Sequence, residues 1–156
     1  MEFILPKYNL HLNENVLQIF YNYIQKKHDA KEAGGVLTGK IYHELIKILN
    51  CSEPTCLDYR SKYNFNRSHN SAQIFINKMF HESNGEEIYL GEWHTHPEDI
   101  PTPSQLDITS FIKTVSKNKL NSNVHYMIII GRTKSYLGVY TNGVKTHEIN
   151  FDNIKL

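Results

Sequence analysis

The chain has 156 residues, 40% hydrophobic and 12% aromatic, which suits one soluble globular domain spanning 1–156 with a sizeable core. Its formal net charge is +1, and no basic run indicates a surface that binds nucleic acid. The longest apolar runs fall far short of the ~18 residues that a membrane span needs. Because the N-terminus also lacks the features of a signal peptide, we expect a cytoplasmic protein.

The first third of the chain predicts a helix followed by two strands. Residues 13–27 carry apolar side chains at helical spacing, and Asn13 is suited to cap the helix start. Three glycines then punctuate short runs rich in branched residues, which favours strands at 35–39 and 41–51 joined by a tight turn.

The middle of the chain begins with an irregular segment. Residues 52–70 are polar and aromatic without a sustained period, and we interpret them as a long loop or an irregular strand. A second helix is predicted at 70–83, with Asn84-Gly85 as its stop signal. Residues 89–96 then have an extended character.

The last third predicts one helix and three strands. Ser104 is a natural N-cap for a helix over 104–118. Strands follow at 124–132, 135–141 and 144–150, the last two joined by the hairpin signal Asn142-Gly143. The interleaving of helices with strand pairs indicates one α/β or α+β domain with a mixed sheet.

The sequence GEWHTHPEDIPTPSQLD, residues 91–107, suggests a metal site. His94 and His96 lie two apart on a predicted strand, so their side chains project to the same face. A zinc ion takes about four ligands, so a third donor must come from elsewhere. The proline-rich turn and the helix that Ser104 opens bring Asp107 back toward the strand end, leaving one position for water.

Simpler interpretations of the same residues exist. In a chain with nine histidines, an H-x-H pair also arises by chance. Ser104 and Asp107 fit a capping box that only satisfies the free amides of a helix start. The metallo-β-lactamase pattern H-x-H-x-D-H and the P-C-x-x-C of zinc deaminases are both missing. Cys51 and Cys56 lack the second pair of a structural zinc site, so we expect reduced, structural thiols.

The spacing of these residues resembles the motif of the JAMM metalloproteases, also called MPN+ or JAB-domain proteins. The motif His94-x-His96-Pro97 is followed by Asp107 with ten residues between His96 and the aspartate, and Ser104 stands three before Asp107. The family also has an upstream glutamate in the setting E-x-G-G-x-L-x-G, which EAGGVLTG at 32–39 matches. The resemblance covers the element order from the first helix to the strand near 126–131, and the last hairpin is compatible with it. It implies the JAMM/MPN fold, a mixed curved β-sheet packed with about three helices.

This resemblance implies a zinc-dependent peptidase or isopeptidase with one zinc ion per chain. The family's three metal ligands map to His94, His96 and Asp107. Zinc lowers the pKa of a bound water toward ~7 and polarises the scissile carbonyl. Glu32 would move a proton from that water to the leaving amine, and Ser104 would donate a hydrogen bond to the oxyanion. The structural alternatives are an exposed glutamate before a glycine turn and a simple helix cap.

The family also implies a class of substrate. JAMM enzymes commonly hydrolyse the isopeptide bond between the C-terminus of a ubiquitin-like modifier and a lysine. This short chain is most similar to bacterial members from cyclic-oligonucleotide (CBASS) antiphage operons, which release a conjugated protein, and a CD-NTase-type enzyme is one such partner. The alternatives are a peptidase that processes a sulfur-carrier or phage-tail protein, and a noncatalytic MPN scaffold.

The remaining polar residues near the motif receive lesser roles. Glu92 is a second carboxylate on the face of His94, but the family pattern gives it no catalytic part. Trp93 and Thr95 point to the other face and are assigned to packing. The aromatic and basic stretch 59–67 is a candidate substrate-binding segment, with loop packing as the alternative. The histidines without ligand spacing are interpreted as ordinary polar or surface residues: His11, His28, His43, His69, His81, His125 and His147.

Overall fold

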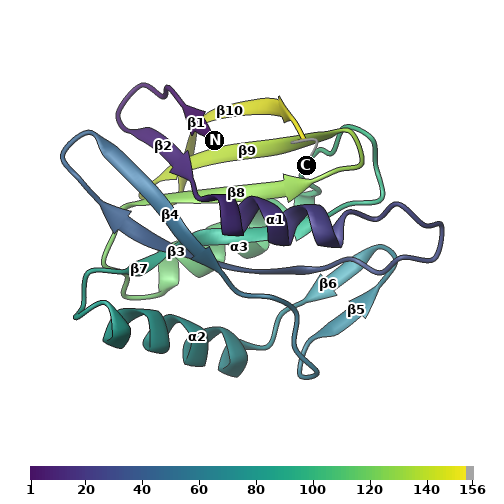
Figure 1. Ribbon diagram of the computed structural model, residues 1–156, viewed down its shortest axis with the longest axis horizontal. Coiled ribbons are helices and arrows are strands. Elements are labelled where there is room, and N and C mark those ends of the chain that lie inside the picture. Colours follow the sequence, from purple (N-terminus) through teal and green to yellow (C-terminus); the bar gives the residue numbers. More distant parts are fainter. Residues whose placement is uncertain (154–156) are drawn as a thin grey trace.

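A mixed sheet of eight strands organises the computed structural model, which describes residues 1–153 (Figure 1). The spatial order of its strands is β1-β2-β4-β3-β7-β8-β9-β10. These strands are β1 (Glu2–Phe3), β2 (Asn9–Leu12), β3 (Gly34–Ile41), β4 (Leu45–Cys51), β7 (Ile88–Thr95), β8 (Val124–Ile130), β9 (Lys134–Thr141) and β10 (Val144–Asp152). A separate hairpin consists of β5 (Tyr59–Ser61) and β6 (Asn64–Asn66), and the helices are α1 (Glu14–Tyr23), α2 (His69–Glu82) and α3 (Gln105–Lys117).

The sheet is both mixed and strongly curved. Neighbouring strands are antiparallel except for the parallel pairs β2–β4 and β7–β8. The curvature brings the two edge strands together, since the rings of Phe3 on β1 and Phe151 on β10 meet edge to face at 5.0 Å. The predicted fold class, a mixed curved sheet with three helices in a single domain, is therefore confirmed.

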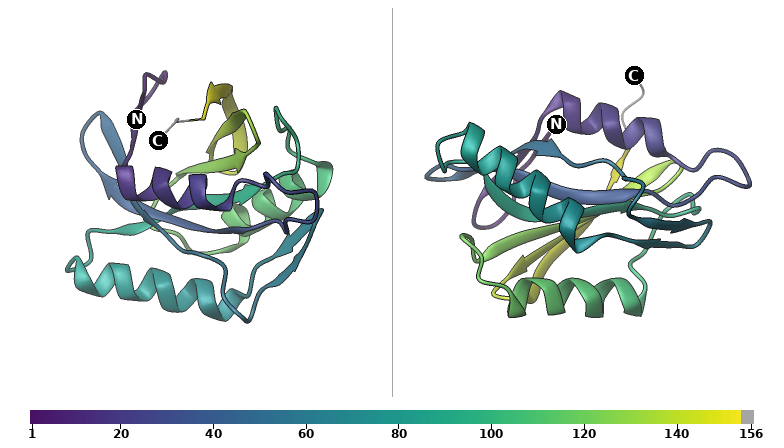
Figure 2. Two further views of the ribbon diagram at one scale, coloured as in Figure 1. Left: turned by 45° about the vertical axis from the view of Figure 1, so that its right-hand side comes forward. Right: turned by 90° about the horizontal axis from the view of Figure 1, so that it is seen from below.

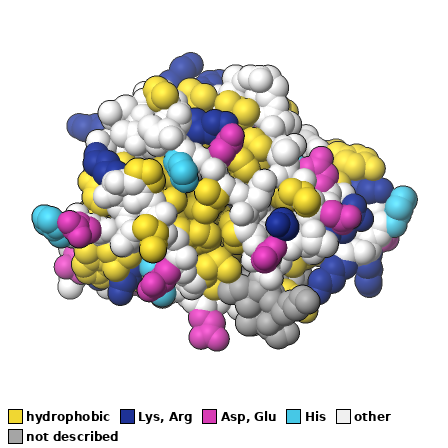
Figure 3. All heavy atoms as spheres, turned by 90° about the horizontal axis from the view of Figure 1, so that it is seen from above, with side chains coloured by type: hydrophobic (Ala, Val, Ile, Leu, Met, Phe, Trp, Pro, Cys, Tyr) yellow, Lys and Arg dark blue, Asp and Glu magenta, His cyan; other side chains and the backbone are white. Residues whose placement is uncertain are grey.

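Helices cover both faces of the sheet (Figure 2). Helix α1 packs through Val16, Leu17 and Phe20 into the core on the concave face. Helices α2 and α3 lie on the other face, where Ala72 and Phe111 join a second core cluster. Charged side chains of both signs are scattered over the face seen in Figure 3. Among residues 1–153, the helices are all too short or too polar to cross a membrane.

Most predicted elements are present within one or two residues, but the strand predicted at 41–51 begins only at Leu45, because β3 continues to Ile41 before the turn. The first helix is also shorter than predicted. We expected it to reach residue 27, whereas it ends at Tyr23 because Ile24 turns into an extended conformation with ψ 128°. The side chain of Gln25 is then buried and hydrogen-bonds to two backbone carbonyls outside the helix. Asn13 occupies the N-cap position without a capping side-chain bond.

Two pieces of the sheet architecture were not predicted. The N-terminal strands β1 and β2 extend the sheet beyond β4, although their residues carry no strong strand pattern. The irregular segment 52–70 contains the β5–β6 hairpin, in which only three residue pairs face each other. Short strands of this kind lack the alternation that identifies a strand in sequence.

Candidate functional site

Strand β7 presents the two histidines of the H-x-H pair on one face. It lies between β3 and β8, and the register pairs His94 with Gly34 on one side and with Ile129 on the other. The alternation of the strand puts Trp93 and Thr95 on the opposite face, where they are 1% and 0% exposed. Trp93 packs against the aromatic rings of α1 at 5.0 and 5.9 Å, which confirms its assignment to the core.

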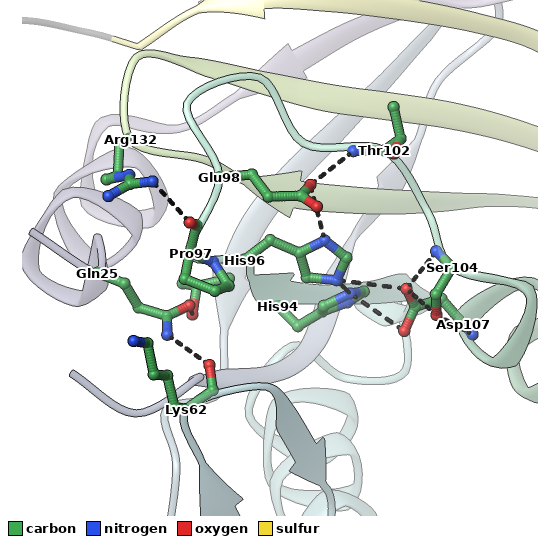
Figure 4. A network of polar contacts seen from close by, with 11 residues as sticks. Gln25, Lys62, His94, His96, Pro97, Glu98, Thr102, Ser104, Asp107 and Arg132 are labelled. Atoms are coloured by element: carbon green, nitrogen blue, oxygen red, sulfur yellow. Dashed lines mark hydrogen bonds and ion pairs between the residues drawn. The ribbon is translucent and has the colours of Figure 1, made fainter. Parts of the chain in front are cut away.

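The first turn of α3 returns Asp107 to the end of β7. Ser104 is the N-cap: its Oγ accepts a hydrogen bond from the Asp107 amide at 3.1 Å, and its own amide donates to Asp107 Oδ2 at 2.7 Å. The capping box is thus present, and the same aspartate also faces the histidines. The two interpretations of this turn are compatible, because capping fixes the carboxylate that points toward His94 and His96 (Figure 4).

The donor atoms of the three residues converge on one point. His94 Nε2 and His96 Nε2 are 3.1 Å apart, and the two Asp107 oxygens lie 3.4 and 3.3 Å from them. Tetrahedral zinc with ligand bonds of about 2.0 to 2.2 Å requires donors about 3.3 to 3.6 Å apart. The observed separations fit such an ion, and three protein donors leave a fourth position open, as catalytic zinc sites require.

The charges around the ligands favour a cation. Burial would raise the pKa of Asp107, but hydrogen bonds from His94, His96 and Ser104 hold it well below its usual range. Burial lowers the pKa of His96, and the Asp107 carboxylate outweighs this and raises it. Glu98, which sequence analysis did not identify, lies 3.5 Å from His96 Nδ1 and orients the ring so that Nε2 faces Asp107.

Glu32 lines the same cleft as the three ligands. The chain continues from Glu32 directly into β3, which begins at Gly34. A Cβ added at Gly34 would lie 2.6 Å from both the Phe65 ring and the Trp93 carbonyl oxygen. Glycine at this position therefore lets β3 approach β7 and the hairpin closely enough to bring Glu32 to the ligands. Glu32 is 5% exposed, and burial raises its pKa to about 7, with the charge of His96 opposing the rise. It is a buried carboxylate, not the exposed glutamate of the structural alternative.

A cleft of about 690 Å³ connects these groups. Glu32, His94, His96, Ser104 and Asp107 all line it, so the structure brings every predicted site residue together. The segment 63–67 of the hairpin region forms another part of the wall. The second half of the stretch 59–67 therefore borders the cleft, as a substrate-binding segment requires.

Two further charged residues line the cleft beside the metal ligands. Glu92 projects from the same face of β7 as His94, but its carboxylate pairs with Arg67 and accepts a hydrogen bond from the Tyr89 hydroxyl at 3.2 Å. This pairing occupies one of its two oxygens and balances the charge of a further carboxylate in the cleft that Asp107 and Glu32 also line. Sequence analysis did not anticipate Arg67 as its partner, because the two are 25 residues apart.

One histidine differs from its predicted environment. His125 is 2% exposed, and neither ring nitrogen has a hydrogen-bond partner among the described residues, so its interpretation as an ordinary polar or surface residue is wrong. The reason is that β8 is buried along its whole length, which the apolar run following His125 indicates. Both cysteines are free thiols, as predicted, with Cys51 buried and Cys56 exposed.

Comparisons with known proteins identify relatives of this chain. A model of the family described as prokaryotic homologs of the JAB domain matches residues 14–142. Three proteins named CD-NTase/cGAS isopeptidase are similar to it: one from Escherichia coli (36% identity, 75% of this chain and 72% of the relative), one from Pseudomonas aeruginosa (32%, 82% and 80%) and one from Vibrio cholerae (34%, 80% and 77%).

A solved structure supports the fold. The solution structure of a protein from Desulfitobacterium hafniense superposes with a TM-score of 0.58 and 18% identity, covering 93% of this chain and 91% of that one. At this identity the likeness concerns the fold alone. The family match over most of the chain, together with the three relatives, means that this protein belongs to the prokaryotic JAB-domain family.

Proposed function

We propose that this protein is a zinc-dependent isopeptidase that cleaves the amide bond between the C-terminus of a conjugated protein and its target. The observation that carries this proposal is the convergence of His94, His96 and Asp107 in one cleft with a buried glutamate, Glu32. A noncatalytic scaffold does not require these four side chains to face one another.

His94, His96 and Asp107 would hold the zinc ion, one per chain. When bound there, zinc supplies Lewis acidity toward the scissile carbonyl and activates a water molecule as nucleophile. Glu98 contributes through its contact with His96 Nδ1, which keeps the ring oriented with Nε2 in the cleft. The low pKa of Asp107 keeps this ligand anionic over the physiological pH range.

Glu32 would transfer the protons. Its carboxylate accepts one from the attacking water and gives it to the leaving amine, so it must exchange a proton readily near neutral pH. Burial supplies this property, since it raises the pKa of Glu32 to about 7. The backbone of Phe65 lies near the carboxylate and opposes part of this rise in pKa.

Ser104 would stabilise the oxyanion. Its hydroxyl donates to Asp107 Oδ2 at 2.7 Å, at the edge of the ligand cluster. The hydroxyl hydrogen can rotate about the Cβ–Oγ bond, so it could donate to a substrate carbonyl oxygen while Oγ keeps its capping contact with the Asp107 amide. Such a donor contributes ~2.7 to 4 kcal/mol in other hydrolases. The residue also caps α3, so its two roles have to be separated by experiment.

The substrate we propose is a protein conjugated through its C-terminus, with a CD-NTase-type enzyme first among the candidates and a ubiquitin-like modifier second. The names of three relatives that align over most of their length support the first. The hairpin β5–β6 borders the cleft, and the exposed Tyr63 there offers an aromatic surface to an extended C-terminal tail. A sulfur-carrier or phage-tail substrate has no comparable support.

Cleavage of a defined conjugate tests this proposal. The substrate is a CD-NTase-type enzyme from a neighbouring gene, linked through its C-terminus to a lysine-bearing peptide, with products identified by mass spectrometry. Protein with one zinc ion per chain should cleave at the junction. Glu32→Gln should retain zinc and lose about 10³-fold or more in kcat. The matched variant Glu44→Gln, on an 84% exposed side chain, should behave as wild type. If zinc-loaded wild type cleaves neither this conjugate nor a ubiquitin-like one, the proposal is wrong.

A further inference from the structure

The amide of Gln25 joins three separate segments of the chain beneath the cleft. The residue is 2% exposed and lies just after the end of α1. Its Nε2 donates hydrogen bonds to the carbonyl oxygens of Ala30 and Lys62, at 2.9 and 3.0 Å. Its Oε1 accepts one from the Thr95 hydroxyl at 3.0 Å. Both hydrogens of the amide nitrogen and one lone pair of the oxygen are therefore used; Figure 4 shows the bond to Lys62.

The contact with Thr95 reaches the metal-ligand strand. Thr95 lies between His94 and His96 with its side chain on the opposite face, and it is fully buried. Its hydroxyl donates to Gln25 and accepts a bond from the Ala33 amide at 3.0 Å, while its own amide donates to the Ala33 carbonyl at 2.8 Å. Thr95 thus connects Gln25 to the residue directly after Glu32, and its role exceeds the packing we predicted.

The contact with Lys62 reaches the turn of the β5–β6 hairpin. The same hairpin holds the backbone of Glu32 on both sides: the Glu32 amide donates to Ser61 O at 2.8 Å, and Arg60 Nε donates to Glu32 O at 2.7 Å. Glu32 is therefore positioned by the hairpin. The side chain of Gln25 ties the turn of that hairpin to the ligand end of β7, while Arg67 after β6 pairs with Glu92 farther along the same strand.

We infer that Gln25 is a positioning residue that locks the hairpin, the Glu32 segment and the metal-ligand strand into one unit. This inference rests on the proposed function for its effect on catalysis, but not for its effect on structure. The lock links a segment that borders the substrate cleft to the group that transfers protons. An apolar side chain of the same length fills the space, but it leaves the part-buried carbonyls of Ala30 and Lys62 and the buried Thr95 hydroxyl without this partner.

The kinetic test compares Gln25→Met with Gln18→Met. Gln18 lies on the exposed side of α1, where it bonds Asn22 at 3.1 Å, so this control makes the same chemical change away from the lock. Gln25→Met should bind one zinc ion per chain and lose about 10- to 100-fold in kcat with little change in KM, because Glu32 is misplaced while the ligands are not. A loss of activity that only follows the folded fraction, or that appears in KM alone, overturns the inference.

Variants at Thr95 test the lock from its other end. Thr95→Val keeps the shape and removes the hydroxyl, whereas Thr95→Ser keeps the hydroxyl, so only the first should reproduce the loss in kcat. The double variant Gln25→Met with Thr95→Val should lose no more than the larger single variant, because both break one connection. Fully multiplicative losses would show that the two residues act independently and would contradict the lock.

Hydrogen exchange of zinc-loaded protein provides a readout without substrate. Gln25→Met should accelerate amide exchange in residues 30–33 and 60–62, and Gln18→Met should not. If wild type cleaves no conjugate, the proposed function fails while this measurement still decides the coupling. If wild type is active but exchange at these two segments is unchanged in Gln25→Met, the inference fails and the proposed function stands.

Discussion

The half-buried pair His94 and His96 and the buried His125, which come from the neighbouring strands β7 and β8, differ sharply in their surroundings. His94 pairs with Ile129 across β7 and β8, and His125 lies four residues before Ile129, so both groups face the same side of the sheet at opposite ends. At one end the ring nitrogens of His94 and His96 meet Asp107 within 3.4 Å. At the other end neither nitrogen of His125 has a partner among the described residues.

The comparison shows that the neighbouring side chains decide the pKa, and hence the charge, of a desolvated histidine. Burial lowers the pKa of both His96 and His125. Asp107 reverses the effect for His96, whereas nothing opposes it for His125, whose pKa falls to about 4. A carboxylate in contact with a desolvated imidazole therefore makes that imidazole part of a cation-binding site. Without one, the same side chain is a neutral and poorly satisfied part of the core.

Removing the Asp107 carboxylate should have the largest effect on zinc content and on kcat. In Asp107→Ala, His94 and His96 lose their common partner, and a site with two protein donors no longer holds zinc firmly. We expect zinc content to fall from one per chain to nearly zero and kcat to fall by about 10³-fold or more. Metal analysis after dialysis and a cleavage assay measure the two effects.

The control for this variant is Asp99→Ala, in the turn that precedes α3. Asp99 is 69% exposed and pairs with Arg132 at 3.0 Å, away from the ligands. It should retain both zinc and activity. Stoichiometric zinc in folded Asp107→Ala would show that the two histidines bind metal without the anion, and the comparison with His125 would lose its basis.

Variants of Ser104 test the second kind of contact that Asp107 makes, its hydrogen bonds with the N-cap. Ser104→Ala should keep zinc but lose about 10²- to 10³-fold in kcat, because the oxyanion loses a donor. The loss of the cap should also lower the free energy of unfolding by about 1 kcal/mol. Ser104→Thr keeps hydroxyl and cap and should retain most activity. If Ser104→Ala changes stability without changing kcat, the residue is only a cap.

The arrangement of His94, His96 and Asp107 was predictable because it depends on local geometry. The alternation of β7 fixes the direction of His94 and His96, and one turn plus a capping box returns Asp107 within eleven residues of His96. Glu32 lies sixty-two residues before His94, so physical reasoning on spacing does not reach it, and its prediction came from the family motif. The structure explains the motif through Gly34, which permits the close approach of β3.

The unpredicted features depend on contacts across long stretches of sequence. Gln25 was assigned to a helix because the apolar period continues to Ile24, and only its bonds to Lys62 and Thr95 show why the helix ends earlier. A lone histidine such as His125 gives no local signal of burial beyond the apolar run after it. Strands as short as β5 and β6 have too few residues to show a period.

Ionisation of the buried Glu32 should lower the free energy of unfolding of the metal-free protein. Its pKa is about 7 in the native state against 4.5 ordinarily, so the native state holds an extra proton between these values. The free energy of unfolding therefore falls as pH rises from 4.5 to 7. Glu32→Gln removes this loss and should stabilise by about 1 to 3 kcal/mol above pH 7, with no gain below pH 4.5. Urea unfolding with a chelator measures the difference, and Glu44→Gln is the control. An equal stability at pH 8 would show that Glu32 ionises freely.

His125 should show the opposite pH dependence. Its pKa is about 4 in the native state against 6.5 ordinarily, so the unfolded state binds the extra proton and stability is lost as pH falls from 6.5 to about 4. His125→Leu removes two buried nitrogens without partners and should stabilise by about 1 to 2 kcal/mol at pH 7. The gain should widen at pH 5, whereas His43→Leu, on a 96% exposed side chain, should show no such widening. A gain that is the same at both pH values would mean that His125 ionises as readily in the core as in water, and the contrast between the two ends of the sheet would then disappear.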